Sequence, residues 1–172
     1  MSLPLNYRIR LIHADDAASI QFIQSACYPA HLLESTQALL AKCSLSPQSC
    51  WLAESEKGSL GYLFTHPWHA NEPPALNQVL ERLPEHADTF FLHDLAIHPD
   101  SRKQGMAQAL IRQAMTWARM QRLRKAMLVA VQGSQAFWHQ QGFCKHRSPS
   151  PALQEKLNHY GPDAVCLMAE IR

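Results

Sequence analysis

The 172-residue chain contains no apolar run near the ~18–20 residues that a membrane-spanning helix needs. Its start also lacks the apolar stretch of a signal peptide, because polar and apolar side chains alternate from Tyr7 to Arg10. The five cysteines are odd in number, and no two form a C-x-x-C pair. These absences argue against a spanning or secreted protein, so we expect reduced thiols, a cytoplasmic location and no membrane partner.

Sequence motifs for nucleotides and metals are also missing. Neither G-x-x-x-x-G-K-[ST] nor G-x-G-x-x-G occurs, which removes the main support for nucleotide hydrolysis and for dinucleotide binding. Among the ten histidines, His66 and His69 come closest to ligand spacing, but no Cys or His cluster stands near them. We therefore expect no metal site.

The composition does predict a folded core. Apolar residues make up 47% of the chain and charged residues only 17%, which is far from the polar bias of a disordered segment. The length suits one domain, and we expect residues 1–172 to form it.

Charge is segregated along the chain. Residues 1–100 carry five basic and eleven acidic side chains, whereas residues 101–154 carry nine basic side chains and no acidic one. Such a stretch indicates either a solvated helix face or a polyanionic partner, which is a phosphate-bearing cofactor or a nucleic acid. Because interleaved aromatic residues and nucleic-acid-binding motifs are absent, we expect no nucleic-acid partner.

Helical and strand patterns alternate along the chain, which indicates a mixed α/β class with one central sheet. The strongest strand runs from Phe90 to Ile97, and the longest helix, with an i, i+3, i+4, i+7 apolar stripe, covers about 105–122. We expect further strands over 7–12, 49–54, 60–65, 126–131, 143–146 and 164–171, and further helices over 15–26, 36–42, 76–82 and 133–140.

A phosphate-binding signal lies between the strongest strand and the longest helix. The sequence there is Arg102-Lys103-Gln104-Gly105-Met106-Ala107. A strand, a glycine turn and a helix start direct unpaired N–H groups and the positive helix end toward an anion. Gly105 carries no Cβ to keep a phosphate away, and Ala107 is small. A well-made helix start with two surface bases is the simpler alternative.

A family resemblance rests on two segments. Leu95-Ala96-Ile97-His98-Pro99-x-x-Arg102-x-x-Gly105-x-Ala107 resembles the acetyl-CoA motif of the GNAT superfamily of acyl-CoA-dependent N-acetyltransferases. Phe137-Trp138-His139-Gln140-Gln141-Gly142-Phe143 is similar to that superfamily's later F-Y-x-x-x-G-F segment. The resemblance covers about residues 90–145.

The resemblance implies a mixed sheet that is splayed between the strand ending at Ile97 and the strand starting near Ala126. Acetyl-CoA, leaving as coenzyme A, would lie in that gap. Backbone groups of Leu95 and Ile97 would pair with its pantetheine arm and thioester, and the amides of 102–107 would hold its pyrophosphate. The cofactor-binding residues implied are Leu95, Ala96, Ile97, Arg102, Lys103, Gln104, Gly105, Met106, Ala107, Ser134, Phe137 and Trp138.

Acetyl transfer to nitrogen requires a neutral amine, yet an alkyl ammonium has a pKa near ~10.4, so a base is needed. His93 and Asp94 precede the expected thioester position, and strand alternation predicts that they lie on opposite faces. His93 is the first candidate, because an unperturbed imidazole pKa near ~6.5 suits the task. A structural role for either residue is the alternative. A backbone N–H at Leu95 or Ala96 would stabilise the oxyanion.

The chain departs from the family pattern at two positions. Trp138 replaces the tyrosine thought to protonate the departing thiolate, and an indole cannot pass on its proton. Ser134, His139, Tyr160 or a water molecule are the substitutes. Val131 stands where relatives often carry an asparagine. These departures keep open a non-catalytic acyl-CoA-binding or sensor module as the alternative function.

The acceptor side is expected in the N-terminal part, with Tyr28, His31, Glu34 and the loop 66–74 as cleft wall. Its net negative charge favours a cationic acceptor such as a polyamine, an amino sugar or a lysine-like amine. We expect direct transfer from acetyl-CoA to a primary amine of a small molecule or protein, since no cysteine lies in the motif strand. Many relatives pair, so a homodimer is an expectation.

Overall fold

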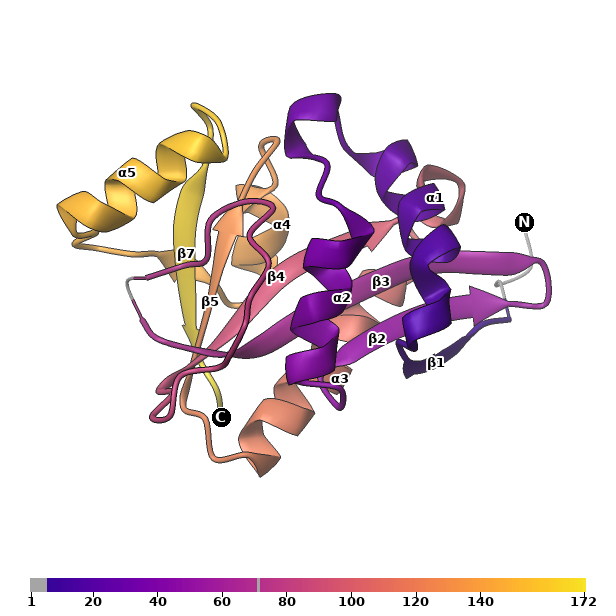
Figure 1. The fold of residues 1–172 in the computed structure, drawn as a ribbon, viewed down its shortest axis with the longest axis horizontal. Coiled ribbons are helices and arrows are strands. Elements are labelled where there is room, and N and C mark those ends of the chain that lie inside the picture. Colours follow the sequence, from indigo (N-terminus) through magenta and orange to yellow (C-terminus); the bar gives the residue numbers. More distant parts are fainter. Residues whose placement is uncertain (1–5, 71) are drawn as a thin grey trace.

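The computed structural model describes residues 6–70 and 72–172, whose seven strands form one mixed sheet (Figure 1). The strands are β1 (Arg8–Leu11), β2 (Cys50–Ser55), β3 (Gly58–Trp68), β4 (Thr89–Ile97), β5 (Lys125–Ala130), β6 (Cys144–Lys145) and β7 (Val165–Glu170). Their order is β1-β2-β3-β4-β5-β7-β6, and only β4 and β5 pair in parallel. This topology confirms the predicted class with one central mixed sheet.

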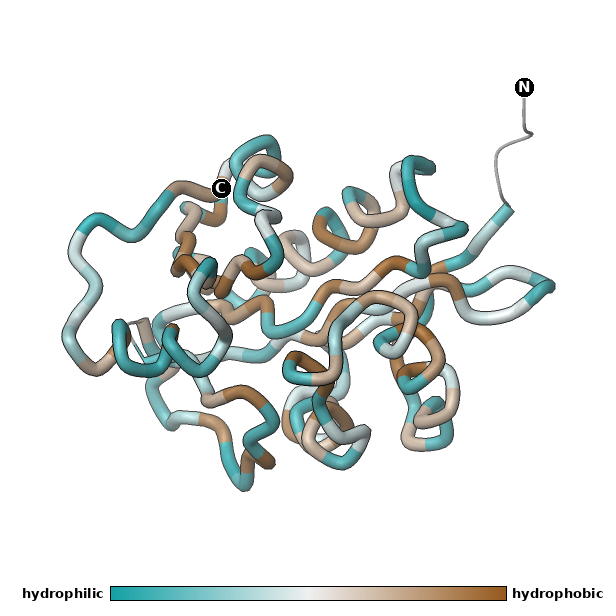
Figure 2. Tube along the Cα trace, turned by 90° about the horizontal axis from the view of Figure 1, so that it is seen from above, coloured by the Kyte–Doolittle hydropathy of each residue, from teal (hydrophilic) through white to brown (hydrophobic). Residues whose placement is uncertain are grey.

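Helices cover both faces of this sheet, as Figure 2 shows from above. They are α1 (Ala17–Cys27), α2 (Thr36–Leu45), α3 (Met106–Met120), α4 (Gln135–Gln140) and α5 (Pro151–His159), with short 3-10 turns η1 (Ala14–Asp16), η2 (Ala30–Leu32) and η3 (Pro99–Ser101). Buried side chains of α3 and α4 pack on one face, and those of α1, α2 and α5 on the other. The sheet therefore lies between two apolar layers.

Local sequence explains the longest helix well. Leu110, Ile111, Ala114 and Ala118 of α3 are all buried, which confirms the predicted apolar stripe. Sequence reasoning missed α5, although its signals are present. Ser150 caps the helix by accepting a hydrogen bond from the Leu153 N–H, and Pro151 occupies the first turn.

The helix expected over 76–82 does not form, so that prediction was wrong. Asn77 has a left-handed φ of 61°, which a continuing helix cannot accommodate. Backbone groups of this segment bond to distant side chains instead, since the Asn77 N–H binds Glu34 and the Gln78 carbonyl binds Lys42. These long-range partners outweigh a weak local helix preference.

Candidate active site

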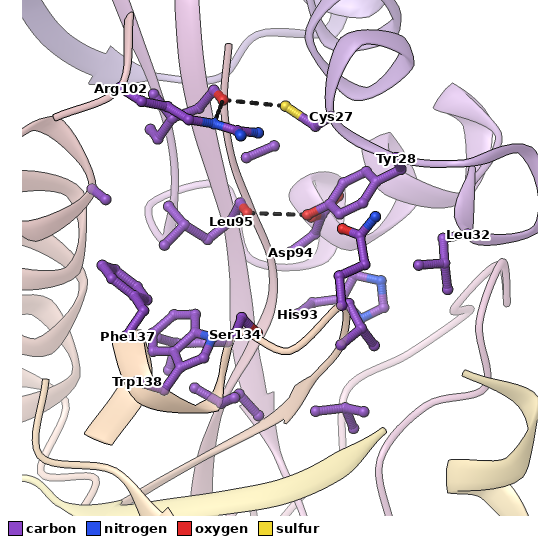
Figure 3. A pocket seen from close by; sticks show the side chains of 18 of the residues that line it. Cys27, Tyr28, Leu32, His93, Asp94, Leu95, Arg102, Ser134, Phe137 and Trp138 are labelled. Carbon is purple, nitrogen blue, oxygen red and sulfur yellow. Dashed lines mark hydrogen bonds between the residues drawn. The ribbon is translucent and has the colours of Figure 1, made fainter. Parts of the chain in front are cut away.

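Strands β4 and β5 separate partway along their length. They pair only where Thr89–Leu92 faces Lys125–Leu128, and both strands continue beyond that point without pairing each other. This confirms the predicted splay. A cavity of about 620 Å³ lies at the opening, between the first turn of α3, the start of α4 and the segment joining α1 to α2 (Figure 3). Its volume is that of a typical small-molecule site.

One end of the cavity is formed by the predicted phosphate turn. Gly105 precedes α3 with φ 74° and ψ 3°, and a Cβ at this position would meet no atom within 4 Å. The backbone is therefore left-handed and open toward the cavity. Arg102, Lys103, Gly105, Met106 and Ala107 line this end, whereas Gln104 is not among the lining residues.

The basic stretch contributes little to the cavity. Of its nine basic side chains, only Arg102 and Lys103 line it. Arg102 also ties the turn to β4, because its Nε donates to the Ile97 carbonyl at 3.1 Å. Arg119 lies in the last turn of α3, with Arg122 and Arg124 beyond it, at the end of the helix opposite Gly105. Most of the positive stretch is thus remote from the phosphate turn.

The segment containing α4 supplies the apolar wall. Ser134, Phe137 and Trp138 all line the cavity, but His139 does not. Trp138 is only 7% exposed, and its ring packs edge-on against Phe137 and Phe143. The indole is therefore a packing group. Of the side chains considered as thiolate acids, Ser134 and Tyr160 reach the cavity.

His93 and Asp94 lie on the same face of the sheet, so the expectation of opposite faces was wrong. Phe64 of β3 faces Asp94 and Thr65 faces Leu92, which leaves His93 as an extra residue in β4. Such a β-bulge interrupts the two-residue alternation. Both side chains consequently project toward the side covered by α1 and α2.

Asp94 is a buried carboxylate whose hydrogen bonds come from tyrosine hydroxyls. The Tyr28 hydroxyl donates to its Oδ1 at 2.6 Å, and the Tyr62 hydroxyl donates to its Oδ2 at 2.7 Å. Burial and the nearby Glu34 carboxylate raise the pKa of Asp94 to about 6, although the two hydroxyls oppose this rise. Asp94 can thus take up or release a proton near neutral pH.

Glu34 forms the second buried carboxylate. Its Oε1 lies 2.6 Å from His93 Nε2, its Oε2 accepts the Asn77 N–H at 2.7 Å, and Lys42 Nζ lies 3.8 Å away. Burial alone would raise the pKa of Glu34, but His93 and Lys42 outweigh it and lower the pKa to about 2. Glu34 is therefore ionised and fully engaged by the protein.

His93 is enclosed by its neighbours. Its side chain is 1% exposed, its ring contacts those of His66 and Phe91, and its Nδ1 has no hydrogen-bond partner among the described residues. His93 and Tyr28 both line the cavity, but the Tyr28 hydroxyl also lies 3.0 Å from the Leu95 carbonyl. The Tyr28 hydroxyl also donates to Asp94 at the cavity wall, and Figure 3 shows its contact with the Leu95 carbonyl.

Backbone groups of β4 face the gap at alternate residues. The Leu95 carbonyl lies 3.0 Å from the Tyr28 hydroxyl, and the Ile97 carbonyl accepts from Cys27 Sγ at 3.2 Å and from Arg102. Both carbonyls therefore point away from β3. Since the N–H and carbonyl of one strand residue point to the same side, the Leu95 N–H also faces the gap, whereas the groups of Ala96 face β3.

The remaining expected residues are placed as follows. Tyr160 lines the cavity, and its buried hydroxyl donates to the Pro74 carbonyl at 2.7 Å. Burial raises the pKa of Tyr160 above its ordinary value. His31 is exposed and is not among the residues that line the cavity.

Sequence reasoning missed two residues that contact the carboxylates of Asp94 and Glu34, namely Tyr62 and Lys42. Both are fully buried, and Lys42 Nζ donates to the carbonyls of Ala38 and Gln78. A lysine within the apolar run of α2 was the available signal for a buried partner. Within the described residues, no group of three or more His, Cys, Asp or Glu side chains could hold a metal ion.

Comparison with known proteins identifies the family. A family model described as the acetyltransferase (GNAT) family matches residues 17–143, which is well over half of the chain. The chain belongs to this family. The family typically uses acyl-CoA, and the motif residues around Gly105 and Trp138 fall inside the match.

Solved structures share the fold at low identity. The loading GNATL domain of CurA from Lyngbya majuscula is 15% identical with a TM-score of 0.80, over 96% of this chain and 98% of that chain. The GphF GNAT-like decarboxylase in complex with isobutyryl-CoA is 18% identical with a TM-score of 0.71, over 96% and 100%. The PaiA N-acetyltransferase from Thermoplasma acidophilum in complex with coenzyme A is 12% identical with a TM-score of 0.64, over 96% and 99%.

No curated protein matches this chain in sequence. Across the part of the chain that the structure describes, no helix combines the length and apolar character needed to cross a bilayer. Because proteins of this fold include both a decarboxylase and an acetyltransferase, the chemistry must be argued from the site itself.

Proposed function

We propose that this protein transfers the acetyl group of acetyl-CoA to a primary amine by direct attack in a ternary complex. One observation carries the proposal: a single cavity joins an open helix start at Gly105 to a buried carboxylate, Asp94, whose pKa is about 6. The first feature suits a diphosphate, and the second suits removal of a proton from an amine.

The residues present fit coenzyme A. Backbone amides from Arg102 to Ala107 would hold the pyrophosphate, and the missing Cβ of Gly105 leaves room for it. The Ile97 N–H, which faces the gap like that of Leu95, would pair with the pantetheine arm. Solved structures of the same fold contain coenzyme A or an acyl-CoA, which supports this cosubstrate.

Asp94 is better placed than His93 to act as the base. Both residues line the cavity, but the His93 side chain is 1% exposed and bound to Glu34, whereas Asp94 is bound to the Tyr28 hydroxyl at the cavity wall. The acceptor ammonium would give a proton to the Tyr28 oxygen while Tyr28 passes its own proton to Asp94 Oδ1. With a pKa of about 6, Asp94 is ionised and ready to accept at pH 7.

The neutral amine then attacks the thioester carbonyl, so a C–N bond forms and the C–S bond breaks. The attacking nitrogen becomes positively charged in this step and loses its excess proton to the departing thiolate or to water. The Leu95 N–H faces the gap and would donate to the oxyanion. The thiolate leaves with assistance from Ser134 or water, or without assistance. A thiol pKa near ~8.5 makes unaided departure at neutral pH cost only about 2 kcal/mol.

Release of free thiol from acetyl-CoA across a panel of amines tests the proposal. We expect saturable turnover that falls at least about 100-fold in Asp94→Asn with little change in coenzyme A affinity. Asp163→Asn, at an exposed position outside the cavity, is the matched control. Tight coenzyme A binding without turnover on any amine would instead support the non-catalytic acyl-CoA-binding module that Trp138 and Val131 left open.

A further inference from the structure

The two ends of the cavity differ in exposure. Arg102, Lys103 and Gly105 at the phosphate end are exposed. At the other end, Leu32 is 7%, Glu34 6% and Tyr160 6% exposed. These walls of the acceptor end are therefore covered by the protein itself, whereas Tyr28 and Leu76 beside them are half-buried.

A segment between β3 and β4, residues 72–80, forms part of this closure; we call it the strap. Pro73, Pro74 and Leu80 of the strap are buried, and Leu76 lines the cavity. The strap is thus packed onto the domain as a wall of the site.

Three hydrogen bonds to buried side chains fasten the strap. The Asn77 N–H donates to Glu34 Oε2 at 2.7 Å, Lys42 Nζ donates to the Gln78 carbonyl at 2.8 Å, and the Tyr160 hydroxyl donates to the Pro74 carbonyl at 2.7 Å. Glu34 and Lys42 belong to the α2 side of the gap, whereas Tyr160 follows α5 on the β7 side. The strap consequently bridges the two sides of the splayed sheet across the acceptor end.

This bridge removes the open groove that a polypeptide acceptor requires. A peptide bound in extended form needs a continuous channel for its backbone on at least one side of the modified residue. Here the buried contact between Tyr160 and Pro74 lies across the acceptor end, where the backbone of a bound peptide would have to pass. A compact free molecule is the acceptor that fits.

The charges at this end accommodate one cation. Both Glu34 oxygens are already bound, to His93 and to the Asn77 N–H, and Lys42 lies beside this carboxylate. Asp94, reached through Tyr28, is the carboxylate whose partners are neutral hydroxyls. Leu32 and Leu76 also line this end, and a second ammonium beside these apolar side chains would be buried without a partner.

We propose that the acceptor is a small free monoamine with an apolar body, and that the strap excludes polypeptide amines and diamines. This inference rests on the proposed function. It narrows the cationic acceptors expected from the sequence, because a polyamine would bring a second charge into an apolar, closed space.

Matched acceptors test the inference. With the full chain and acetyl-CoA, we compare pentylamine with 1,5-diaminopentane, which differ by one terminal ammonium, and phenethylamine with tripeptides that carry a free N-terminus or a lysine. We expect kcat/KM for the monoamines to exceed that for the diamine by at least about 100-fold, with no measurable peptide acetylation.

Variants of the strap separate its role from that of the catalytic groups. Leu76→Ala should raise kcat/KM for phenethylamine relative to pentylamine by about tenfold, because it removes three side-chain carbons from the wall. Tyr160→Phe keeps the ring but loses the bond to Pro74, and should raise relative activity on larger amines. Val79→Ala, at a strap residue that is 44% exposed, should leave the ratio unchanged.

The outcomes are distinguishable. Peptide or diamine turnover equal to that of the monoamines in the wild-type protein would overturn the inference and leave the proposed function standing. Absence of turnover on every amine and peptide, with coenzyme A still bound, would overturn both. If kcat/KM for phenethylamine relative to pentylamine were unchanged in both Leu76→Ala and Tyr160→Phe, this result would contradict the role of the strap.

Discussion

Asp94→Asn should make the protein more stable at alkaline pH. Burial raises the pKa of Asp94 from 3.8 to about 6. Ionisation of Asp94 is therefore less favourable in the folded protein than in the unfolded chain, and it lowers the free energy of unfolding. A rise of about two pKa units corresponds to about 3 kcal/mol. The contribution of Asp94 to stability is therefore full below pH 4 and is lost as pH rises through 6.

An asparagine at this position keeps the shape and can still exchange hydrogen bonds with Tyr28 and Tyr62. We expect urea unfolding at pH 8 to show a gain of up to about 3 kcal/mol for Asp94→Asn, which vanishes at pH 4. Asp163→Asn, at an exposed position, should show no such pH-dependent gain. Equal or lower stability of Asp94→Asn at pH 8 would refute the reasoning.

The same residue should set the pH dependence of acetyl transfer. Because Asp94 must be ionised to accept a proton, kcat/KM of the wild-type protein should fall below a midpoint near pH 6. Asp94→Asn should lack this limb and retain only residual activity. A variant that gains stability while it loses turnover cannot be explained by a purely structural aspartate.

Three further substitutions have defined outcomes. Glu34→Gln should lower the free energy of unfolding at pH 7 by about 3 kcal/mol in urea denaturation, because it leaves Lys42 without its buried counter-charge. Gly61→Ala should cost about 2 kcal/mol in thermal unfolding, since its Cβ would lie 2.5 Å from Ile97 Cδ1 and 2.8 Å from a backbone oxygen. Gly105→Glu should weaken coenzyme A binding in calorimetry at least about tenfold more than Gly105→Ala, which shares the backbone strain without the charge.

The parts of the fold that depend on short-range pattern could be predicted from the sequence. The apolar stripe of α3 and the glycine at its start lie within a few residues of each other, so one local pattern contains both. The separation of β4 from β5 followed from the family resemblance. Helix α5 could have been predicted from Ser150 and Pro151, whose cap was overlooked.

The arrangement of the acceptor end could not be read from the sequence in the same way. A single extra residue in β4 places His93 and Asp94 on one face, and no residue type in the sequence predicts this bulge. The partners of Glu34, namely Lys42 and the Asn77 N–H, come from separate elements that only the folded chain brings together. Tyr160 meets Pro74 across 86 positions of sequence.

Two buried carboxylates stand side by side here with opposite pKa shifts, and their partners explain the difference. Glu34 is bound by His93 and by the Asn77 N–H, and Lys42 lies beside it, so its pKa is lowered and it is ionised. It holds the strap and His93 in place. Asp94 is bound by two neutral hydroxyls, which satisfy its oxygens without compensating its charge. A carboxylate kept in that state lowers the stability of the fold at neutral pH, yet its proton affinity lies close to that pH. Proton removal from an amine requires an environment like that of Asp94, and fixing the geometry of the acceptor end requires one like that of Glu34.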